Sequence, residues 1–207
     1  KRCYDEEESG LSSLRMEFNR KHQHLYDIVK ETSQDGSFRY NNIYVDIRFS
    51  NLCNFRCRMC NPTFSSSLAA DFLANNPEAK GSKNGLLRAS DFSKEDFWSQ
   101  VDSIIDNCDH IYFAGGEPLL MEEHYRIIKK LIKEDRYISI DYSTNFSKLR
   151  YKELNFLEVW PKFKNLNVSV SLDGKGKVGE YIRDGQNWKR TEKNLSDFCN
   201  HVGKKHL

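Results

Sequence analysis

The sequence predicts an α/β protein built on a parallel sheet, because strand-like and helix-like segments alternate along the chain. Strands are predicted over residues 44–49, 110–114, 137–142 and 166–172. A helix is predicted in the connection after each strand, over residues 63–75, 122–133, 151–160 and 189–206. The order βαβαβαβα predicts right-handed crossover connections, since neighbouring parallel strands need a crossover between them.

The first strand is predicted from the run Tyr44-Val-Asp-Ile-Arg-Phe49, in which apolar and polar residues alternate. Residues 76–91 form a polar loop whose length is typical of functional or mobile connections. A further helix is predicted over about 94–107, with Ser93 as its N-cap. The apolar residues of that helix recur on one face and are Phe97, Val101, Ile104 and Ile105.

Residues 1–40 precede the first strand and contain the acidic run Asp5-Glu-Glu-Glu8 and one helix predicted over about 11–31. The chain opens without an initiator Met, so we expect an incomplete piece of a longer protein. We expect two parts: an N-terminal helical segment over 1–40 and an α/β domain over 41–207.

Composition restricts the class of protein. Lys and Arg total 32 against 30 for Asp and Glu, and the resulting net charge of +2 is spread along the chain, which does not indicate a dedicated nucleic-acid binder. No apolar run approaches the roughly 20 residues needed to span a bilayer, and no secretory pattern opens the chain. We therefore expect no nucleic-acid or membrane partner and a cytoplasmic, reduced environment.

Three of the six cysteines lie in the run Cys53-Asn-Phe-Arg-Cys57-Arg-Met-Cys60, directly after the first predicted strand. Three thiolates can hold three irons of a [4Fe–4S] cluster and leave the fourth iron open. A structural zinc site needs four ligands, and no second pair with suitable spacing is present. Cys108 and Cys199 are expected to be buried, unreactive thiols on helices.

Polar or glycine-rich clusters follow all four predicted strands. They are the cysteine run, Gly115-Gly116-Glu117-Pro118, Ser143-Thr144-Asn145 and Asp173-Gly174. Because functional loops gather at the carboxyl ends of parallel strands, these clusters predict one shared site.

The cysteine run followed by Gly115-Gly116-Glu117-Pro118 resembles the radical S-adenosylmethionine (radical SAM) superfamily, over roughly residues 43–200. The resemblance implies a partial (β/α)6 barrel, truncated after the fourth βα unit. It implies a [4Fe–4S] cluster on Cys53, Cys57 and Cys60 whose open iron chelates S-adenosyl-L-methionine (AdoMet). Reductive cleavage of AdoMet then gives a 5′-deoxyadenosyl radical that abstracts hydrogen from a substrate.

The resemblance also implies roles for the strand-end residues. Gly115 and Gly116 would let backbone approach the ligand closely, and Glu117 would accept hydrogen bonds from the methionine ammonium. Ser143 and Asn145 would bond ribose hydroxyls.

Three more residues belong to the implied cofactor site. Ser171 would face the nucleoside, Arg183 would pair with the AdoMet carboxylate, and Met59 would pack on adenine where the family usually has an aromatic residue. Asp173 would face the substrate, and no side chain is expected to act as a catalytic acid or base.

The opening segment around Cys3 resembles the tail of the auxiliary-cluster (SPASM or twitch) domains found with peptide-modifying members. This implies a peptide substrate, with small molecules still open, and a flavodoxin- or ferredoxin-type electron donor. Two other readings remain open at this point: a non-catalytic iron–sulfur electron-transfer or scaffold protein, and a zinc-stabilised binding module.

Overall fold

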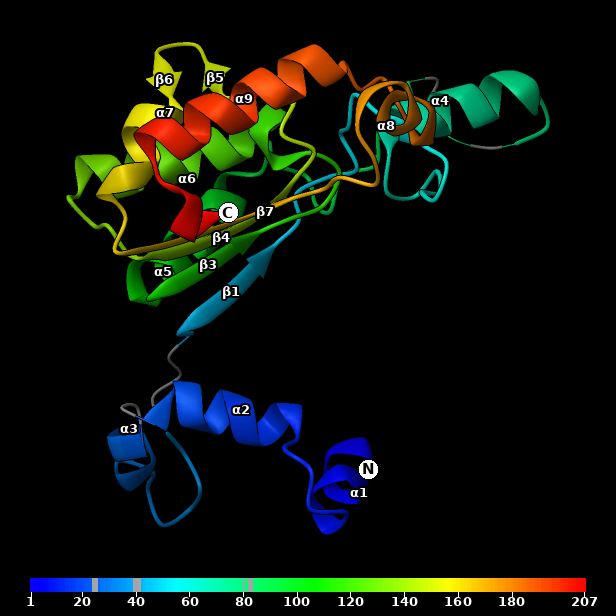
Figure 1. Cartoon of the computed structure of the whole chain (residues 1–207). Helices are drawn as coiled ribbons and strands as arrows, with labels where there is room; N and C mark the ends of the chain where they lie inside the picture. Colours follow the sequence, from blue (N-terminus) through cyan, green and yellow to red (C-terminus); the bar gives the residue numbers. More distant parts are fainter. Residues whose placement is uncertain (24–25, 39–41, 80, 82–83) are drawn as a thin grey trace. The chain divides into compact units, whose positions relative to one another are not determined.

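The computed structural model describes residues 1–23, 26–38, 42–79, 81 and 84–207 and divides the chain into two compact units, Lys1–Asn41 and Asn42–Leu207 (Figure 1). The first unit contains α1 (Arg2–Glu8), α2 (Leu14–Lys21) and α3 (Tyr26–Lys30). The single helix predicted over 11–31 is confirmed only in part: α2 ends at Lys21, α3 spans Tyr26–Lys30, and residues 24–25 lie outside the described residues. None of the residues of α2 is buried, so no apolar face holds a longer helix together.

The second unit is built on a four-stranded sheet in which all neighbours are parallel. Its strands are β1 (Tyr44–Ile47), β3 (His110–Phe113), β4 (Ser139–Thr144) and β7 (Asn165–Val170), in the order β1-β3-β4-β7. Tyr44 pairs with His110, His110 with Ser139, and Ser139 with Asn165, so the amino ends of the strands are aligned. The predicted α/β class and parallel sheet are confirmed.

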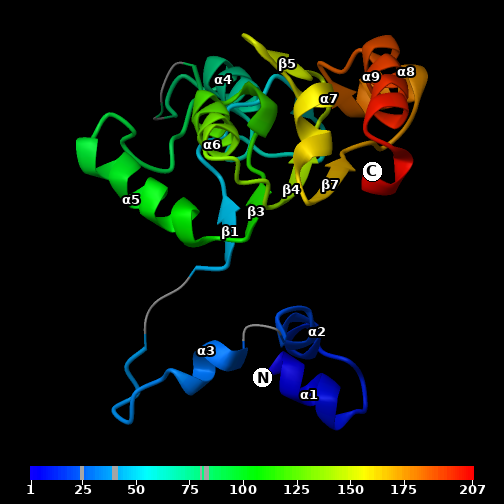
Figure 2. The same ribbon diagram turned by 90° about the vertical axis from the view of Figure 1, so that its left-hand side faces the viewer.

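Among the described residues, six helices accompany these strands, four in the connections between them and two after the last strand. They are α4 (Ser66–Asn75), α5 (Glu95–Asn107), α6 (Glu122–Lys133), α7 (Phe156–Val159), α8 (Gly176–Ile182) and α9 (Trp188–His201). Figure 1 shows α6, α7 and α9 over one face of the sheet, and Figure 2 shows the four strands side by side beneath α6 and α7. This one-sided cover resembles the wall of a barrel with its helices outside.

The core lies between the sheet and this helical layer. Side chains alternate between the two faces of a strand, and in β4 Ile140 and Tyr142 are buried while Asp141 and Ser143 are only half-buried. The helices contribute the buried side chains of Ile127, Ile128, Leu131, Phe156, Trp160 and Phe198. The apolar face of the sheet therefore fixes the register that places the polar strand ends together.

Several short elements complete the unit. They are β2 (Arg56–Cys57), β5 (Arg150–Tyr151), β6 (Leu154–Asn155), β8 (Arg183–Asp184) and the 3₁₀ turns η2 (Pro118–Leu120), η3 (Trp160–Lys162) and η4 (Lys204–His206). The helix predicted over 151–160 is largely wrong, because the chain first makes the β5–β6 hairpin, with Lys152 at φ +50°, before α7 begins. The strand predicted over 137–142 is displaced to Ser139–Thr144.

The predicted N-cap of α5 is wrong as well. Lys94 occupies the N-cap position and makes no side-chain capping bond. Ser93 instead donates its backbone N–H (3.1 Å) and its hydroxyl (2.6 Å) to Asp91 Oδ1, forming an Asx turn ahead of the helix. Among the described residues, no helix combines the length and apolar character needed to cross a bilayer.

One polar pair lies inside the apolar core. His124 of α6 and Tyr142 of β4 are both fully buried, and His124 Nε2 lies 2.9 Å from the Tyr142 hydroxyl. Burial lowers the pKa of His124 to about 3, so the imidazole is neutral at neutral pH. This hydrogen bond joins α6 to β4, two residues before the end of that strand.

We expect Tyr142→Phe to lower the free energy of unfolding by about 1–3 kcal/mol, because His124 Nε2 then loses its partner at a buried position. Urea unfolding followed by circular dichroism measures the change. Tyr112→Phe is the matched control: its hydroxyl makes no hydrogen bond among the described residues, and we expect a change within about 0.5 kcal/mol. Equal stability of the Tyr142 variant and the parent would show that the bond contributes nothing.

Candidate functional site

A cavity of about 330 Å³ gathers the residues that follow the strands of the sheet. Every residue predicted to bind the cluster or AdoMet, except Glu117, lines it: Cys53, Cys57, Cys60, Met59, Gly115, Gly116, Ser143, Asn145, Ser171 and Arg183. The lining also includes residues that were not predicted: Phe55, Asn61, Phe64 and Ser65. The first three of these are unremarkable in sequence, and only the folded cysteine loop brings them to the cavity.

Three consecutive serines at the start of α4 hold the cysteine loop. The Ser65 hydroxyl donates to Phe55 O (2.6 Å), and the Ser67 hydroxyl donates to Cys53 O (2.7 Å). Ser66 Oγ accepts from Cys53 N (3.1 Å). These bonds satisfy loop backbone groups that have no ladder or helix partner. The sequence signal for this anchor, a run of serines just after the last cysteine, was present but not used.

A short antiparallel bridge holds the same loop from the other side. In β2, Arg56 pairs with Asp184 and Cys57 pairs with Arg183 of β8. The Arg56 guanidinium also forms an ion pair with Asp184 at 2.8 Å. The segment that follows β7 therefore holds the middle of the cysteine loop through β8.

This bridge places Arg183 against the cysteines. Arg183 Nη1 lies 3.7 Å from Cys57 Sγ, and Arg183 Nε forms an ion pair with Asp173 at 2.5 Å. Arg183 Nη2 has no protein partner among the described residues and belongs to a side chain that lines the cavity. Asp173, which we expected to face the substrate, is instead engaged with Arg183.

Burial changes the acidity of the thiols. Desolvation raises the pKa of Cys53 to about 11 and also raises the pKa of Cys57. Donors from Phe55 N (3.5 Å) and Asn145 Nδ2 (3.8 Å) approach Cys53 Sγ and partly offset this effect. A metal that binds here must displace the thiol protons, so its affinity depends on pH.

The donor set fits a cluster better than a single ion. A zinc ion needs four ligands at one centre, whereas a cubane takes one thiolate per iron, so its ligands stay apart. Three thiols lining one cavity are suited to a [4Fe–4S] cluster with one open iron.

The glycine pair brings two segments of backbone into contact. A Cβ on Gly116 would lie 2.3 Å from Leu52 O, and Gly115 has φ +112°. Glu117 N donates to Leu52 O at 2.7 Å. The glycines therefore allow the loop after β3 to run against the residue that precedes Cys53, in addition to lining the cavity.

Glu117 is placed differently from the expected contact with a methionine ammonium. Its side chain is 0% exposed and does not line the cavity. Glu117 Oε1 accepts from Leu119 N (3.0 Å) and from the Thr144 hydroxyl (2.7 Å), and Oε2 accepts from Asn145 N (2.6 Å). Both oxygens are thus committed to the protein, and Glu117 ties the loop after β3 to the end of β4.

Burial raises the pKa of Glu117 to about 7, although its three donors oppose the shift. Between the ordinary value of 4.5 and about 7, the folded state keeps a proton that the unfolded chain releases. Stability from this group is therefore present below pH 4.5 and is lost as pH rises through about 7.

We expect Glu117→Gln to lower the free energy of unfolding by about 1–3 kcal/mol, because the new NH₂ group meets a backbone or hydroxyl donor. The loss should be larger near about pH 5 than near about pH 8, since only the parent titrates in this interval. Urea titrations at both pH values measure it. Glu122→Gln, which removes only an exposed ion pair with Lys152 at 2.8 Å, is the control. A pH-independent difference would contradict the assigned titration.

A side-chain network continues from the cavity to the outside of the domain. Asn145 Nδ2 donates to Asn54 Oδ1 (2.9 Å), and Ser147 N donates to Asn145 Oδ1 (3.0 Å). Asn54 Nδ2 donates to the Ser147 hydroxyl at 3.1 Å. Sequence reasoning missed both Asn54 and Ser147, because their partners lie more than 90 residues away along the chain.

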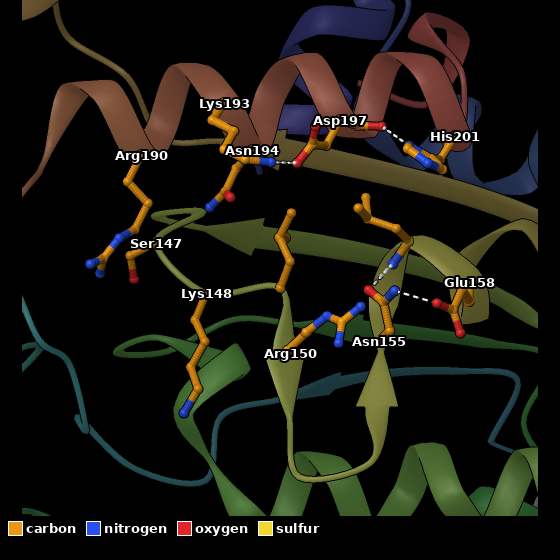
Figure 3. A pocket seen from close by; sticks show the side chains of 12 residues that line it. Ser147, Lys148, Arg150, Asn155, Glu158, Arg190, Lys193, Asn194, Asp197 and His201 are labelled. Carbon is orange, nitrogen blue, oxygen red and sulfur yellow. Dashed lines mark hydrogen bonds and ion pairs between the residues drawn. The ribbon is translucent and has the colours of Figure 1, made fainter.

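A second cavity of about 700 Å³ lies between α9 and the segment that contains β5, β6 and α7 (Figure 3). It contains no cysteine and no predicted site residue. Ser147 lines this cavity and hydrogen-bonds to the cysteine loop, so the two cavities are neighbours. We assign the candidate active site to the smaller cavity because the thiols and strand ends meet there.

Known proteins similar to this chain include one protein family and several solved structures. The family model described as the radical SAM superfamily matches residues 47–204. No curated protein shows significant similarity to the sequence.

The chain resembles anSMEcpe with bound AdoMet and Cp18Cys peptide at 19% identity and a TM-score of 0.47, covering 76% of this chain and 40% of that one. It resembles Streptococcus suis SuiB bound to S-adenosylmethionine at 18% identity and a TM-score of 0.44, covering 91% of this chain and 35% of that one. The chain thus spans well under half the length of either protein.

The family match extends from the last residue of β1 to the first residue of η4 and includes the cysteine loop and all four strand ends. It covers more than half of the sequence, and the chain belongs to the radical SAM superfamily.

Proposed function

We propose that this chain forms the cofactor-binding part of a radical SAM enzyme, with a [4Fe–4S] cluster on Cys53, Cys57 and Cys60 and AdoMet in the adjoining cavity. The observation that carries the proposal is the presence of all three thiols in one cavity with the polar ends of the strands. When bound, the cluster and AdoMet supply reductive cleavage of AdoMet and the radical that abstracts hydrogen from a substrate.

The protein's part is binding and orientation. Met59 is 57% exposed on the cavity lining, where a flexible thioether can cover an adenine ring. Ser143 and Ser171 present hydroxyls from the ends of β4 and β7 toward the same space, where they can bond a ribose. Arg183 Nη2 is available for a carboxylate, because Asp173 pairs with Nε and only Nη1 lies near Cys57.

The substrate and the electron donor belong to the proposal as well. We propose a peptide or small-molecule substrate and a flavodoxin- or ferredoxin-type donor in the cytoplasm, where the thiols stay reduced. We further propose that residues 1–40 form a helical segment distinct from the barrel part at 41–207, and that this segment is the tail of an auxiliary-cluster domain.

We expect anaerobically reconstituted chain to contain about four iron and four sulfide. Cys57→Ala should lose the cluster and abolish formation of 5′-deoxyadenosine from AdoMet under a chemical reductant, since one iron loses its ligand. Metal analysis and chromatography of the products measure both. Cys199→Ser, which changes a half-buried thiol on α9, should retain both properties.

Cleavage that persists in Cys57→Ala would defeat the assignment of the ligands. A loaded cluster whose EPR spectrum does not respond to AdoMet would favour the alternative, a non-catalytic iron–sulfur electron-transfer or scaffold protein. Zinc in place of iron and sulfide would favour a zinc-stabilised module.

We expect Arg183→Gln to raise the dissociation constant for AdoMet by at least about tenfold, because a charge-assisted hydrogen bond to the carboxylate is lost. Titration calorimetry with reconstituted protein measures the affinity. Arg126→Gln, which breaks an ion pair with Asp102 (3.3 Å) on the helical layer, should bind AdoMet as the parent does. Unchanged affinity in the Arg183 variant would remove this residue from the AdoMet site.

A further inference from the structure

We propose that one end of the outer cavity is the docking surface for an acidic protein that delivers single electrons to the cluster. We call this surface the basic end and define it by Ser147, Lys148, Arg150 and Arg190. The inference rests on the proposed function, because only a reducible cluster gives such a donor a purpose.

The basic end is separated from the acidic groups of the same cavity. Figure 3 shows Arg190, Ser147 and Lys148 together at one end, and Glu158 and His201 at the other. Arg190 lies in the first turn of α9, and Lys148 follows β4. Lys148 and Arg190 therefore lie at the end from which Ser147 reaches the cysteine loop, and Arg150 lies between this end and Asn155.

The cations of the basic end are not neutralised by the protein. Elsewhere in the cavity, Lys193 pairs with Asp197 at 2.5 Å. Among the described residues, no ion pair or hydrogen bond involves the side chain of Lys148, Arg150 or Arg190. Lys148 Nζ lies 5.2 Å from the centre of the Tyr151 ring. Three unpaired cations on one surface attract an acidic partner and orient its approach.

The basic end is connected to a cluster ligand by a short series of polar contacts. Ser147 bonds to Asn54 (3.1 Å), and Asn54 bonds to Asn145 (2.9 Å). Asn145 Nδ2 lies 3.8 Å from Cys53 Sγ. A partner seated on Ser147 is thus separated from the Cys53 thiol by three side chains, those of Ser147, Asn54 and Asn145, and a short route favours electron transfer.

The exposure of the surface favours a protein partner over a small anion. Arg150 and Arg190 are exposed, and Lys148 is half-buried, so none of the three cations is enclosed as in a dedicated anion pocket. Weak redox complexes bury small, charged interfaces and exchange quickly. The donor gives up one electron and is oxidised, the cluster gains that electron and is reduced, and no proton or bond is exchanged.

The test compares reduction of the reconstituted cluster by flavodoxin hydroquinone and by dithionite in stopped-flow absorbance measurements. We expect the double variant Lys148→Glu and Arg190→Glu to slow reduction by flavodoxin at least about tenfold at low ionic strength and to flatten its salt dependence. Reduction by dithionite and AdoMet cleavage under dithionite should be unchanged, because a small reductant needs no docking surface.

The matched control carries Lys162→Glu and Lys164→Glu, which make the same charge change at exposed lysines before the amino end of β7. We expect parental rates from it with both reductants.

Equal slowing by both double variants, unchanged rates in the Lys148 and Arg190 variant, or an equal loss with dithionite would overturn the proposal. Inhibition of the parent by inorganic phosphate at constant ionic strength, with no effect of the substitutions on flavodoxin, would assign the surface to a small anion instead. Loss of AdoMet cleavage in the parent itself would instead count against the proposed function.

Discussion

The rest of the site depends on how the cysteine loop is fixed, because a loop with almost no secondary structure of its own must hold three thiols around one cavity. Backbone from distant parts of the chain supplies the restraint. Gly116 runs against Leu52 where a Cβ would lie 2.3 Å from the carbonyl oxygen, and β8 pairs with β2 at Cys57. Serines at the start of α4 donate hydrogen bonds to the carbonyl oxygens of Cys53 and Phe55. Binding of a cluster thus becomes a property of the whole domain.

Below this loop, one buried carboxylate joins two strand ends. Glu117 accepts hydrogen bonds from the end of β4 through Thr144 and Asn145, and Asn145 in turn reaches toward Cys53. A buried charge is costly unless donors surround it, and here the donors come from the two elements that must stay together. The hydrogen bonds that lower the cost of burying Glu117 therefore also hold the two strand ends together.

The domain also has a polar route from its interior to its surface. Asn145 faces the inner cavity, Asn54 belongs to the cysteine loop, and Ser147 lines the outer cavity. Of the unpaired cations, Lys148 and Arg190 lie at the end of the outer cavity where this route emerges. Cofactor binding and the delivery of electrons can thus use adjoining but separate surfaces.

The α/β class, the parallel strands and the cavity-lining cysteines could all be predicted from the sequence, because each rests on a local period or spacing such as that of Tyr44–Phe49 or Cys53–Cys60. The helix prediction is largely wrong at 151–160, where a hairpin precedes a short helix, since helix propensity there is overridden by tertiary packing. That Glu117 turns inward and that Arg183 contacts Cys57, 126 residues away, became visible only in the folded chain. Such contacts depend on the path of the whole chain, which no local pattern encodes.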